Sequence, residues 1–233
     1  SGGGRVLLTV SGALALDGAR TRVSANGLAG ADGLVEGSVG ARDFALNGGA
    51  SGSGTERFGG GGGAGGSVWI VAANVTGYGA IEADGGAGGD AGIYAGVRWW
   101  GGGGGSGGRI AVHCTNCSSL SDASYDAGVA RWGPWALSAR GGSGGASWDD
   151  RSGDALLYRV EAGAAGTVFG DVAGDRTLLV NGGGAAAAPS SGRRLDAAGD
   201  LTSDSALAWT TLSGSPLASL SQLVLRDCKL KLQ

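Results

Sequence analysis

Gly-Gly-Ser-Val-Trp-Ile-Val-Ala, at residues 65–72, is one copy of a pattern that recurs along the chain. The other copies are Gly-Gly-Gly-Arg-Val-Leu-Leu-Thr-Val at residues 2–10, Gly-Gly-Arg-Ile-Ala-Val-His-Cys at residues 107–114, and the weaker Ala-Gly-Thr-Val-Phe at residues 165–169. Apolar residues alternate in each copy, as they do in a strand with one buried face. Superposing the copies predicts three inward columns of stacked apolar residues, namely Val6, Val68 and Ile110, then Leu8, Ile70 and Val112, then Val10, Ala72 and Cys114. The opposite face of these strands would carry Leu7, Trp69 and Ala111.

A second short element follows each copy and reads aliphatic, any residue, small aliphatic, polar, Gly. We expect the first residues of this element to form another inward column, made of Val23, Ile81, Leu137 and Leu178. Behind it we expect a row of small apolar residues, namely Ala25, Ala83, Ala139 and Val180. The residues between these two rows should face water, namely Ser24, Glu82 and Ser138. The register is then fixed, because a slip of one residue would bury Glu82.

Constant strands separated by Gly-rich segments of variable length are typical of stacked repeats that pair through parallel backbone hydrogen bonds. The sequence therefore predicts an all-β fold, a Gly-rich parallel β-solenoid with long Gly-rich corner loops and almost no helix. Residues 1–183 would hold about four rungs. Residues 184–233 would continue the same domain with further strands and end in an unfinished rung, which predicts that the natural chain continues.

Glycine is the most abundant residue, at 53 of 233. We expect the Gly runs to lie at rung corners, where positive φ and close backbone approach exclude a side chain. Flexible linkers are one alternative interpretation. Packed left-handed polyglycine helices with three residues per turn are another, which we disfavour because Gly at every third position is not sustained.

The charge balance excludes some classes of partner. Lys and Arg number 17 against 20 Asp and Glu, for a net charge of -3, and the basic residues are scattered. Nucleic-acid binding requires clustered Lys and Arg, so we do not expect it. No apolar run reaches the roughly 18 residues that span a bilayer, so we do not expect membrane insertion of this stretch either.

Cysteines and sequons indicate the compartment. We expect a disulfide, either between Cys114 and Cys117 or from one of them to Cys228. Two N-glycosylation sequons begin at Asn74 and Asn116, each just after a first-element strand, at equivalent rung corners. Together these features predict an extracellular or cell-surface location.

Residues suited to catalysis are few. His113 is the only His, and we expect an outward strand residue with a satisfied imidazole. The acids Asp149, Asp150 and Asp154 lie near Trp148 and Arg151, where solvated loop residues are the simplest interpretation, with glycoside cleavage or calcium binding as alternatives. We therefore expect no catalytic residue, no cofactor and no metal ligand.

Four tryptophans lie outside the predicted strands, namely Trp99, Trp100, Trp132 and Trp135. They either pack over the Gly-rich corners, which lack side chains of their own, or form an exposed aromatic surface. Such a surface would contact a sugar ring or a neighbouring subunit.

The Gly-Gly strand motif, the second element ending in Gly, and the later Ala-Gly-Thr-Val-Phe and Thr-Leu-Leu-Val-Asn-Gly-Gly together resemble Gly-rich repeat regions of very large surface proteins of algae, oomycetes and other protists. The arrangement is also similar to parallel β-helices of the pectate-lyase-like superfamily, although no catalytic motif of the lyases can be placed on this chain. The resemblance covers about residues 2–184. It implies a component of an extracellular matrix, cell wall or flagellar hair.

The expected function is a non-enzymatic structural module, a filament subunit or spacer. Its partners would be other copies or neighbouring structural subunits, or a polysaccharide. The alternative is a β-helix that binds or cleaves carbohydrate. Fold alone does not separate these two functions.

Overall fold

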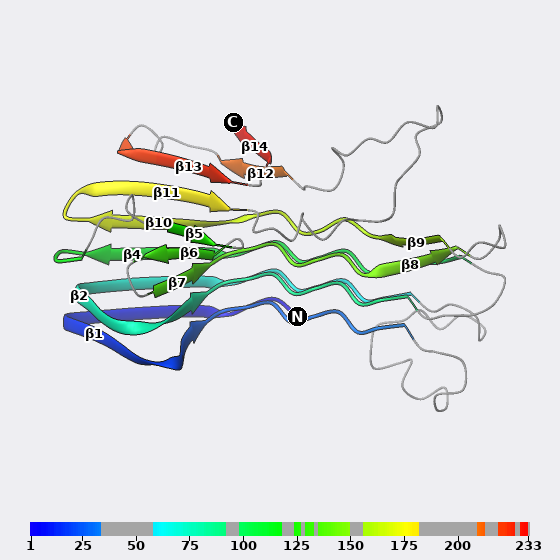
Figure 1. Cartoon of the computed structure of the whole chain (residues 1–233), viewed down its shortest axis with the longest axis horizontal. Coiled ribbons are helices and arrows are strands. Elements are labelled where there is room, and N and C mark those ends of the chain that lie inside the picture. Colours follow the sequence, from blue (N-terminus) through cyan, green and yellow to red (C-terminus); the bar gives the residue numbers. More distant parts are fainter. Residues whose placement is uncertain are drawn as a thin grey trace.

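The structure is a computed structural model that describes residues 1–33, 58–91, 98–117, 124–126, 129–132, 135–149, 156–181, 209–212, 219–226 and 229–232. Nearly all of the regular structure in these ranges is β-strand (Figure 1). The strands are β1 (Arg5–Ser24), β2 (Ser67–Glu82), β3 (Arg98–Trp99), β4 (Arg109–Cys114), β5 (Ser124–Asp126), β6 (Val129–Trp132), β7 (Trp135–Ser138), β8 (Ala146–Asp149), β9 (Leu156–Arg159), β10 (Gly166–Val172), β11 (Asp175–Asn181), β12 (Trp209–Leu212), β13 (Gln222–Arg226) and β14 (Lys229–Leu232). The predicted all-β class is confirmed.

The main sheet has nine strands in the order β13-β11-β10-β4-β2-β7-β6-β5, with β1 paired to β2. The strand pairs β1–β2, β2–β4, β4–β10, β2–β7 and β11–β13 are parallel, whereas β10–β11, β5–β6 and β6–β7 are antiparallel. Two small sheets, β12–β14 and β3-β8-β9, complete the described strands. The sheet is therefore mixed, and the expectation of uniformly parallel pairing is wrong.

The predicted register of the first element is confirmed. Val68 pairs with Val6 on one side and with Ile110 on the other, and the other two predicted columns pair in the same way. The weaker fourth copy joins them, because β10 pairs in parallel with β4 and places Val168 beside Ile110. Leu7 and Trp69 lie on the opposite face and are exposed, as expected for alternating strand residues.

The second element stacks as predicted over its first three copies. Ile81 pairs with Val23 and with Leu137, and Ile81 and Leu137 are 0% and 1% exposed. The long strands β1 and β2 carry both elements and curve between them (Figure 1). Because Val68, Ile70, Ile81 and Leu137 belong to one cluster of buried side chains, the two elements enclose a common core.

The fourth copy of the second element departs from the prediction. Leu178 does not stack on Leu137 but pairs with Phe169 in β10 and with Leu223 in β13. The two-residue turn between β10 and β11 explains this, since Ala173 and Gly174 have φ angles of 50° and 91°. Positive φ at both central residues is the geometry that joins antiparallel neighbours in a tight hairpin.

The Gly-rich segments are not corner loops. Three outward segments lead away from the sheet, namely residues 25–33, 83–91 and 139–146. Four described return segments lead back to it, namely residues 59–66, 101–108, 160–166 and the short stretch 1–4 before β1. Figure 1 shows them as undulating traces that run side by side from the main sheet toward β8 and β9. We call this set of segments the glycine bundle.

Backbone hydrogen bonds within the glycine bundle recur at every third residue. Gly85 and Gly88 donate to the carbonyls of Arg140 and Ser143 in the next outward segment, and the return segments are linked in the same parallel manner. All the bonds run between segments and have N···O distances of 2.7–3.0 Å. Three residues per turn without internal hydrogen bonds is the pattern of polyproline II and related helices.

Outward and return segments also bond to each other, in antiparallel fashion. Gly86, in an outward segment, donates to Gly63 of one return segment and accepts from Gly105 of the next. The outward segments therefore form one layer and the return segments a second, with backbone directly against backbone. The three-residue packing, which we disfavoured from the sequence, is the better description of these segments.

Steric exclusion rather than positive φ explains the glycines. Positive φ occurs among the described glycines at Gly18, Gly77 and Gly174, and none of these lies in the bundle, so that part of our expectation is wrong. A Cβ on Gly86 would overlap the carbonyl oxygen of Leu28, and one on Gly85 would overlap that of Gly105. We call a segment inner where it has neighbours on both sides in its own layer. Away from its ends, as over residues 84–90, two of every three positions in an inner segment must therefore be Gly, and only the third position can carry a side chain.

We predict that Gly86→Ala destabilises the protein by about 1–3 kcal/mol or more, because backbone atoms would have to move to admit the methyl group. Gly61→Ala is the matched control, since the nearest atom to its added Cβ is the carbonyl oxygen of Gly103 at 3.9 Å. The control should be neutral or more stable by up to about 1 kcal/mol, because Ala restricts the unfolded chain. Urea unfolding followed by tryptophan fluorescence measures both changes, and equal losses in the two variants would refute steric exclusion.

Candidate functional site

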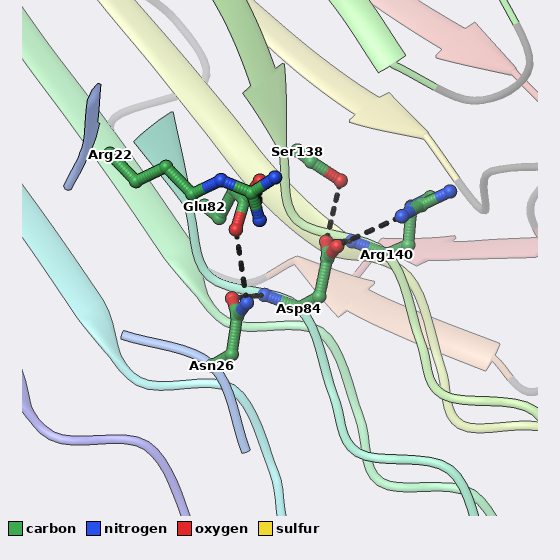
Figure 2. Close-up of polar contacts among 6 residues, drawn as sticks. All are labelled: Arg22, Asn26, Glu82, Asp84, Ser138 and Arg140. Carbon is green, nitrogen blue, oxygen red and sulfur yellow. Dashed lines mark hydrogen bonds and ion pairs between the residues drawn. The ribbon is translucent and has the colours of Figure 1, made fainter. Parts of the chain in front are cut away.

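Polar side chains gather where each outward segment leaves the sheet. Asn26, Asp84 and Arg140 occupy equivalent positions, each directly after the buried small residue of the second element and before the first Gly. Figure 2 shows these three together with their neighbours, and we call the set of Arg22, Asn26, Glu82, Asp84, Ser138 and Arg140 the polar ladder.

The polar ladder links successive rungs through backbone amides. The Asp84 N–H donates to Asn26 Oδ1 at 2.7 Å, and the Arg140 N–H donates to Asp84 Oδ1 at 2.7 Å. In each case the side chain of one rung accepts a hydrogen bond from the equivalent residue of the next rung. These amides lie at the third position of the repeat, which the glycine pattern leaves without a backbone acceptor.

Asp84 is the centre of the polar ladder. Its Oδ1 also accepts from Ser138 Oγ at 2.6 Å, and its Oδ2 accepts from Arg140 Nη2 at 3.1 Å (Figure 2). Ser138 is only 4% exposed, so our expectation that it faces water is wrong. The hydrogen bond to Asp84 satisfies its hydroxyl and makes its burial tolerable.

Glu82 completes the polar ladder on its other side. Asn26 Nδ2 donates to Glu82 Oε2 at 3.2 Å, and Arg22 Nη1 lies 3.5 Å from Glu82 Oε1. The ladder therefore contains two carboxylates and two guanidinium groups, with each carboxylate next to an Arg. Glu82 was expected to face water and is half-buried, and these contacts account for a charged side chain at this position.

A second set of such contacts lies six residues further along the outward segments. The Asp90 N–H donates to Asp32 Oδ1 at 2.9 Å, and the Ala146 N–H donates to Asp90 Oδ1 at 2.7 Å. Six residues are two turns of the three-residue repeat, so Asp32 and Asp90 lie on the same side of their segments as Asn26 and Asp84. The sequence carries a signal for this, since both segments repeat a polar residue with a spacing of six.

The chemistry of the polar ladder suits positioning. Its hydrogen bonds fix the register of the outward segments. Its charged groups pair with each other, Arg22 with Glu82 and Arg140 with Asp84. In the part of the chain that the structure describes, no three side chains of His, Cys, Asp and Glu are grouped to hold a metal ion.

Cys114 and Cys117 form a disulfide directly after β4, so one of the two predicted pairings is confirmed. Cys228 lies outside the described residues. The bridge closes a bend next to the third inward column, because Cys114 pairs with Ala72 in the sheet.

His113 lies on the outer face of the sheet, as predicted, but its imidazole is not fully satisfied. Its ring centroid is 4.6 Å from that of Trp69 and 5.7 Å from that of Phe169, and its Nδ1 is 3.7 Å from Asp171 Oδ2. Its Nε2 is buried and has no hydrogen-bond partner among the described residues. Arg176 Nε donates to the same Asp171 oxygen at 3.3 Å, so this carboxylate lies next to both His113 and Arg176.

The two sequon asparagines lie in different environments. Asn116 is exposed in the bend closed by the disulfide, and its N–H donates to the Ala73 carbonyl at 2.9 Å. Asn74 lies inside β2, opposite Ala13, and is half-buried. The expectation that both follow the end of a strand is therefore right for Asn116 and wrong for Asn74.

The predicted aromatic surface is not assembled. Trp132 and Trp135 pair across the β6–β7 hairpin and are 4% and 3% exposed within the core, so they cannot contribute to a surface. Trp100 is 45% exposed, at the distal end of a return segment. Trp99 pairs with Trp148 between β3 and β8, where the structure describes only the backbone.

The acids suggested for glycoside cleavage or calcium binding are largely outside the described residues. Asp149 is the last residue of β8 and pairs with Arg98 and Leu156 through the backbone. Asp150, Arg151 and Asp154 lie beyond the described ranges, so the structure does not place them relative to Trp148.

Comparison of the chain with protein-family models, with curated proteins and with solved structures finds no match. Within the described ranges, no helix has both the length and the apolar character needed to cross a membrane.

We predict that Asp84→Ala lowers the free energy of unfolding by about 1–3 kcal/mol, because it leaves the Ser138 hydroxyl and the Arg140 amide without an acceptor. Asp84→Asn keeps an oxygen at Oδ1 and should lose only about 1 kcal/mol or less.

The matched control is Asp32→Ala, at an exposed position where water can replace the lost acceptor, and its effect should stay within about 0.5 kcal/mol. Thermal and urea unfolding of the three variants test this order. A loss in Asp84→Ala no larger than that in Asp32→Ala would show that the polar ladder does not contribute to stability.

Proposed function

We propose that this chain is a non-enzymatic structural module of a large extracellular protein, serving as a stiff spacer or filament subunit. In this proposal each return segment, curved pair of strands and outward segment makes one turn of a flattened β-solenoid. The observation that carries the proposal is the glycine bundle, in which hydrogen bonds at every third residue join adjacent segments within and between two layers.

The glycine bundle has properties that suit a rigid element. The inner segments bond to neighbours in their own layer and in the opposite layer, so bending one segment would strain bonds in several directions. Glycine side chains add no rotamer freedom, and the contacts between layers are backbone to backbone. Repeat proteins in which each unit contacts its neighbours gain stability from each interface between them.

The polar ladder supports the same function. Its hydrogen bonds connect equivalent residues of successive rungs, which resists sliding of one outward segment along the next. Asp84 lies at the centre of these contacts and bonds to the backbone and side chain of Arg140. A spacer must keep a constant length, and contacts that fix the register between adjacent segments contribute to this.

The disulfide and the exposed sequon support an extracellular location. Disulfides persist mainly in oxidising compartments, and Cys114–Cys117 closes an exposed bend. The resemblance to surface proteins of protists points to the same location. Neighbouring structural subunits or a polysaccharide would then be the partners, and Phe58 and Trp100, exposed on adjacent return segments, are side chains suited to such contacts.

We expect electron microscopy of the native protein to show rods or fibres, because the proposed stack extends along one axis. Compact monodisperse particles would count heavily against a spacer or filament subunit. A glycan array and a reducing-end assay test the carbohydrate alternative in parallel. Binding that is lost in Trp100→Ala, or release of reducing ends, would favour that alternative.

We also expect glycosylation at Asn116 rather than at Asn74 when the chain passes through a eukaryotic secretory pathway, because Asn116 is exposed whereas Asn74 is half-buried. The measurement is the mass shift on treatment with an N-glycosidase, which Asn116→Gln should abolish. Asn74→Gln is the matched control and should leave the shift unchanged. A secreted chain without any glycan, or with one at Asn74, would contradict this expectation.

A further inference from the structure

The first strand lies at an edge of the main sheet. Among the described strands β1 pairs with β2 alone, so its other side has no described partner. Figure 1 shows β1 at the margin of the sheet, with β2 next to it. An edge strand presents N–H and C=O groups that are ready to pair with a strand of another chain.

The hydrogen bonds between β1 and β2 indicate which backbone groups of β1 face outward. The Ser67 N–H donates to the Gly4 carbonyl, so Gly4 is turned toward β2. Successive residues of a strand direct their N–H and C=O groups to opposite sides, and every second residue after Gly4 is therefore turned toward β2 as well. The residues whose backbone groups point away from β2 are Arg5, Leu7 and Thr9.

The apolar core is open at the same edge. Val6 and Leu8 continue two of the inward columns but are only half-buried. Their neighbours in these columns, Val68 and Ile70, are 2% and 0% exposed. Leu7, on the opposite face of the sheet, is 57% exposed. A strand that joined β1 here would cover apolar side chains on both faces.

Protection against pairing is confined to the curved part of β1. The register with β2 shifts between Val10 and Ala13 and again between Asp17 and Arg22. Such bulges, like charged residues and Pro, hinder the pairing of an edge with another strand. The regular part, residues 5–10, has no bulge and no Pro, and its only charged residue is Arg5.

This regular part is complementary to a second copy of itself. In an antiparallel pair with a two-fold axis at Leu7, the outward-facing backbone groups of each copy meet those of the other. Arg5 of one copy then lies opposite Thr9 of the other, so like charges are not placed opposite each other. Val6 lies opposite Leu8, and because opposite residues share a face of the sheet, the inward columns continue from one copy into the next.

A parallel arrangement is not open to a second copy in the same way. The last strand of the parallel stack is β10, and its side away from β4 is already paired with β11. The β10 strand of one copy therefore cannot add to β1 of another and continue the stack. Antiparallel pairing of β1 with β1 uses an edge that the described strands leave open.

We propose that residues 5–10 form a self-association site, at which two copies of the chain pair in antiparallel fashion around a two-fold axis at Leu7. The pairing joins two main sheets into one and closes the open core of each copy with apolar residues of the other. Two-fold contacts between identical surfaces are the commonest form of association among soluble homo-oligomers. The inference goes beyond the proposed function and does not depend on it, because a structural module is compatible with a monomer and with a pair.

Leu7→Pro tests the site. The substitution removes an N–H that points away from β2, so the pairing of β1 with β2 should be retained. Sedimentation velocity over a concentration series should show a monomer–dimer equilibrium for the wild type. In Leu7→Pro the apparent dissociation constant should rise at least about tenfold, equivalent to roughly 1.4 kcal/mol. The matched control is Leu7→Ile, which keeps the N–H and an apolar side chain and should associate as the wild type does.

Leu7→Cys tests the two-fold register, in a Cys228→Ser background that removes the unpaired third cysteine. The two introduced thiols would lie in a directly opposed pair with Cα atoms about 5.5 Å apart, which is within the range of a disulfide. Mild oxidation should therefore give a covalent dimer on a non-reducing gel. Tyr78→Cys is the control, because Tyr78 is 48% exposed but lies outside the site, and it should stay monomeric on the gel.

Circular dichroism checks that every variant is folded. A wild type that stays monomeric up to its highest soluble concentration would overturn the proposal, as would a dimer that Leu7→Pro leaves unchanged. A dimer that Leu7→Cys does not cross-link would also overturn it, because β1 would then pair with a different strand of the second copy.

Discussion

The closeness of one glycine backbone to its neighbours is the constraint on which the rest of this structure depends. In the inner segments, two of three residues lie so close to a neighbouring carbonyl group that a single carbon atom would not fit. Hydrogen bonds of 2.7–3.0 Å take the place of side-chain packing, so the bundle is held together by groups that every residue except proline has. The requirement on the sequence at these positions is therefore a residue without a side chain, which is Gly.

The sheet and the glycine bundle are joined by a gradual decrease in side-chain size. Along the second outward path the inward residues change from Ile81 to Ala83 to Gly85, and both Ile81 and Ala83 are 0% exposed. Face-to-face sheets are separated by about 10 Å of interdigitated side chains, whereas the glycine layers touch through their backbones. Small residues at the junction let the two layers approach each other without leaving a void, and Asp84 of the polar ladder directly follows Ala83.

The parts of the fold that follow a period of two could be predicted from the sequence. Val68 and Ile81 lie in the register that alternation predicts, because a shift by one residue would expose their columns. The glycine bundle was harder to predict, because its repeat of three lasts only a few turns and changes at the edges, as at Leu28. The hairpin at Ala173 was missed because its turn lacks the Asn-Gly pair that usually marks one.

The candidate site was predictable only in part. The polar position before Gly is visible in the sequence at Asn26 and Asp84, but alternation alone places Ser138 in water, and its burial depends on an oxygen from the preceding rung. The pairing of Cys114 with Cys117 rather than with Cys228 could not be derived from spacing, because both pairings fit the sequence. Trp132 and Trp135 were assigned to a loop, since nothing local indicates that a short hairpin turns them into the core.

The coexistence of two repeats also limits how such a chain can change its length. An insertion of one residue in an outward segment would rotate Ala87 or Asp90 into a position that only Gly can occupy, and deletion of one residue would do the same. Adding a whole triplet to every segment of the stack would lengthen the bundle by one turn and leave each side chain on its original side. Homologues of this chain should therefore differ in the length of their glycine segments by multiples of three residues, while their strands keep the same length.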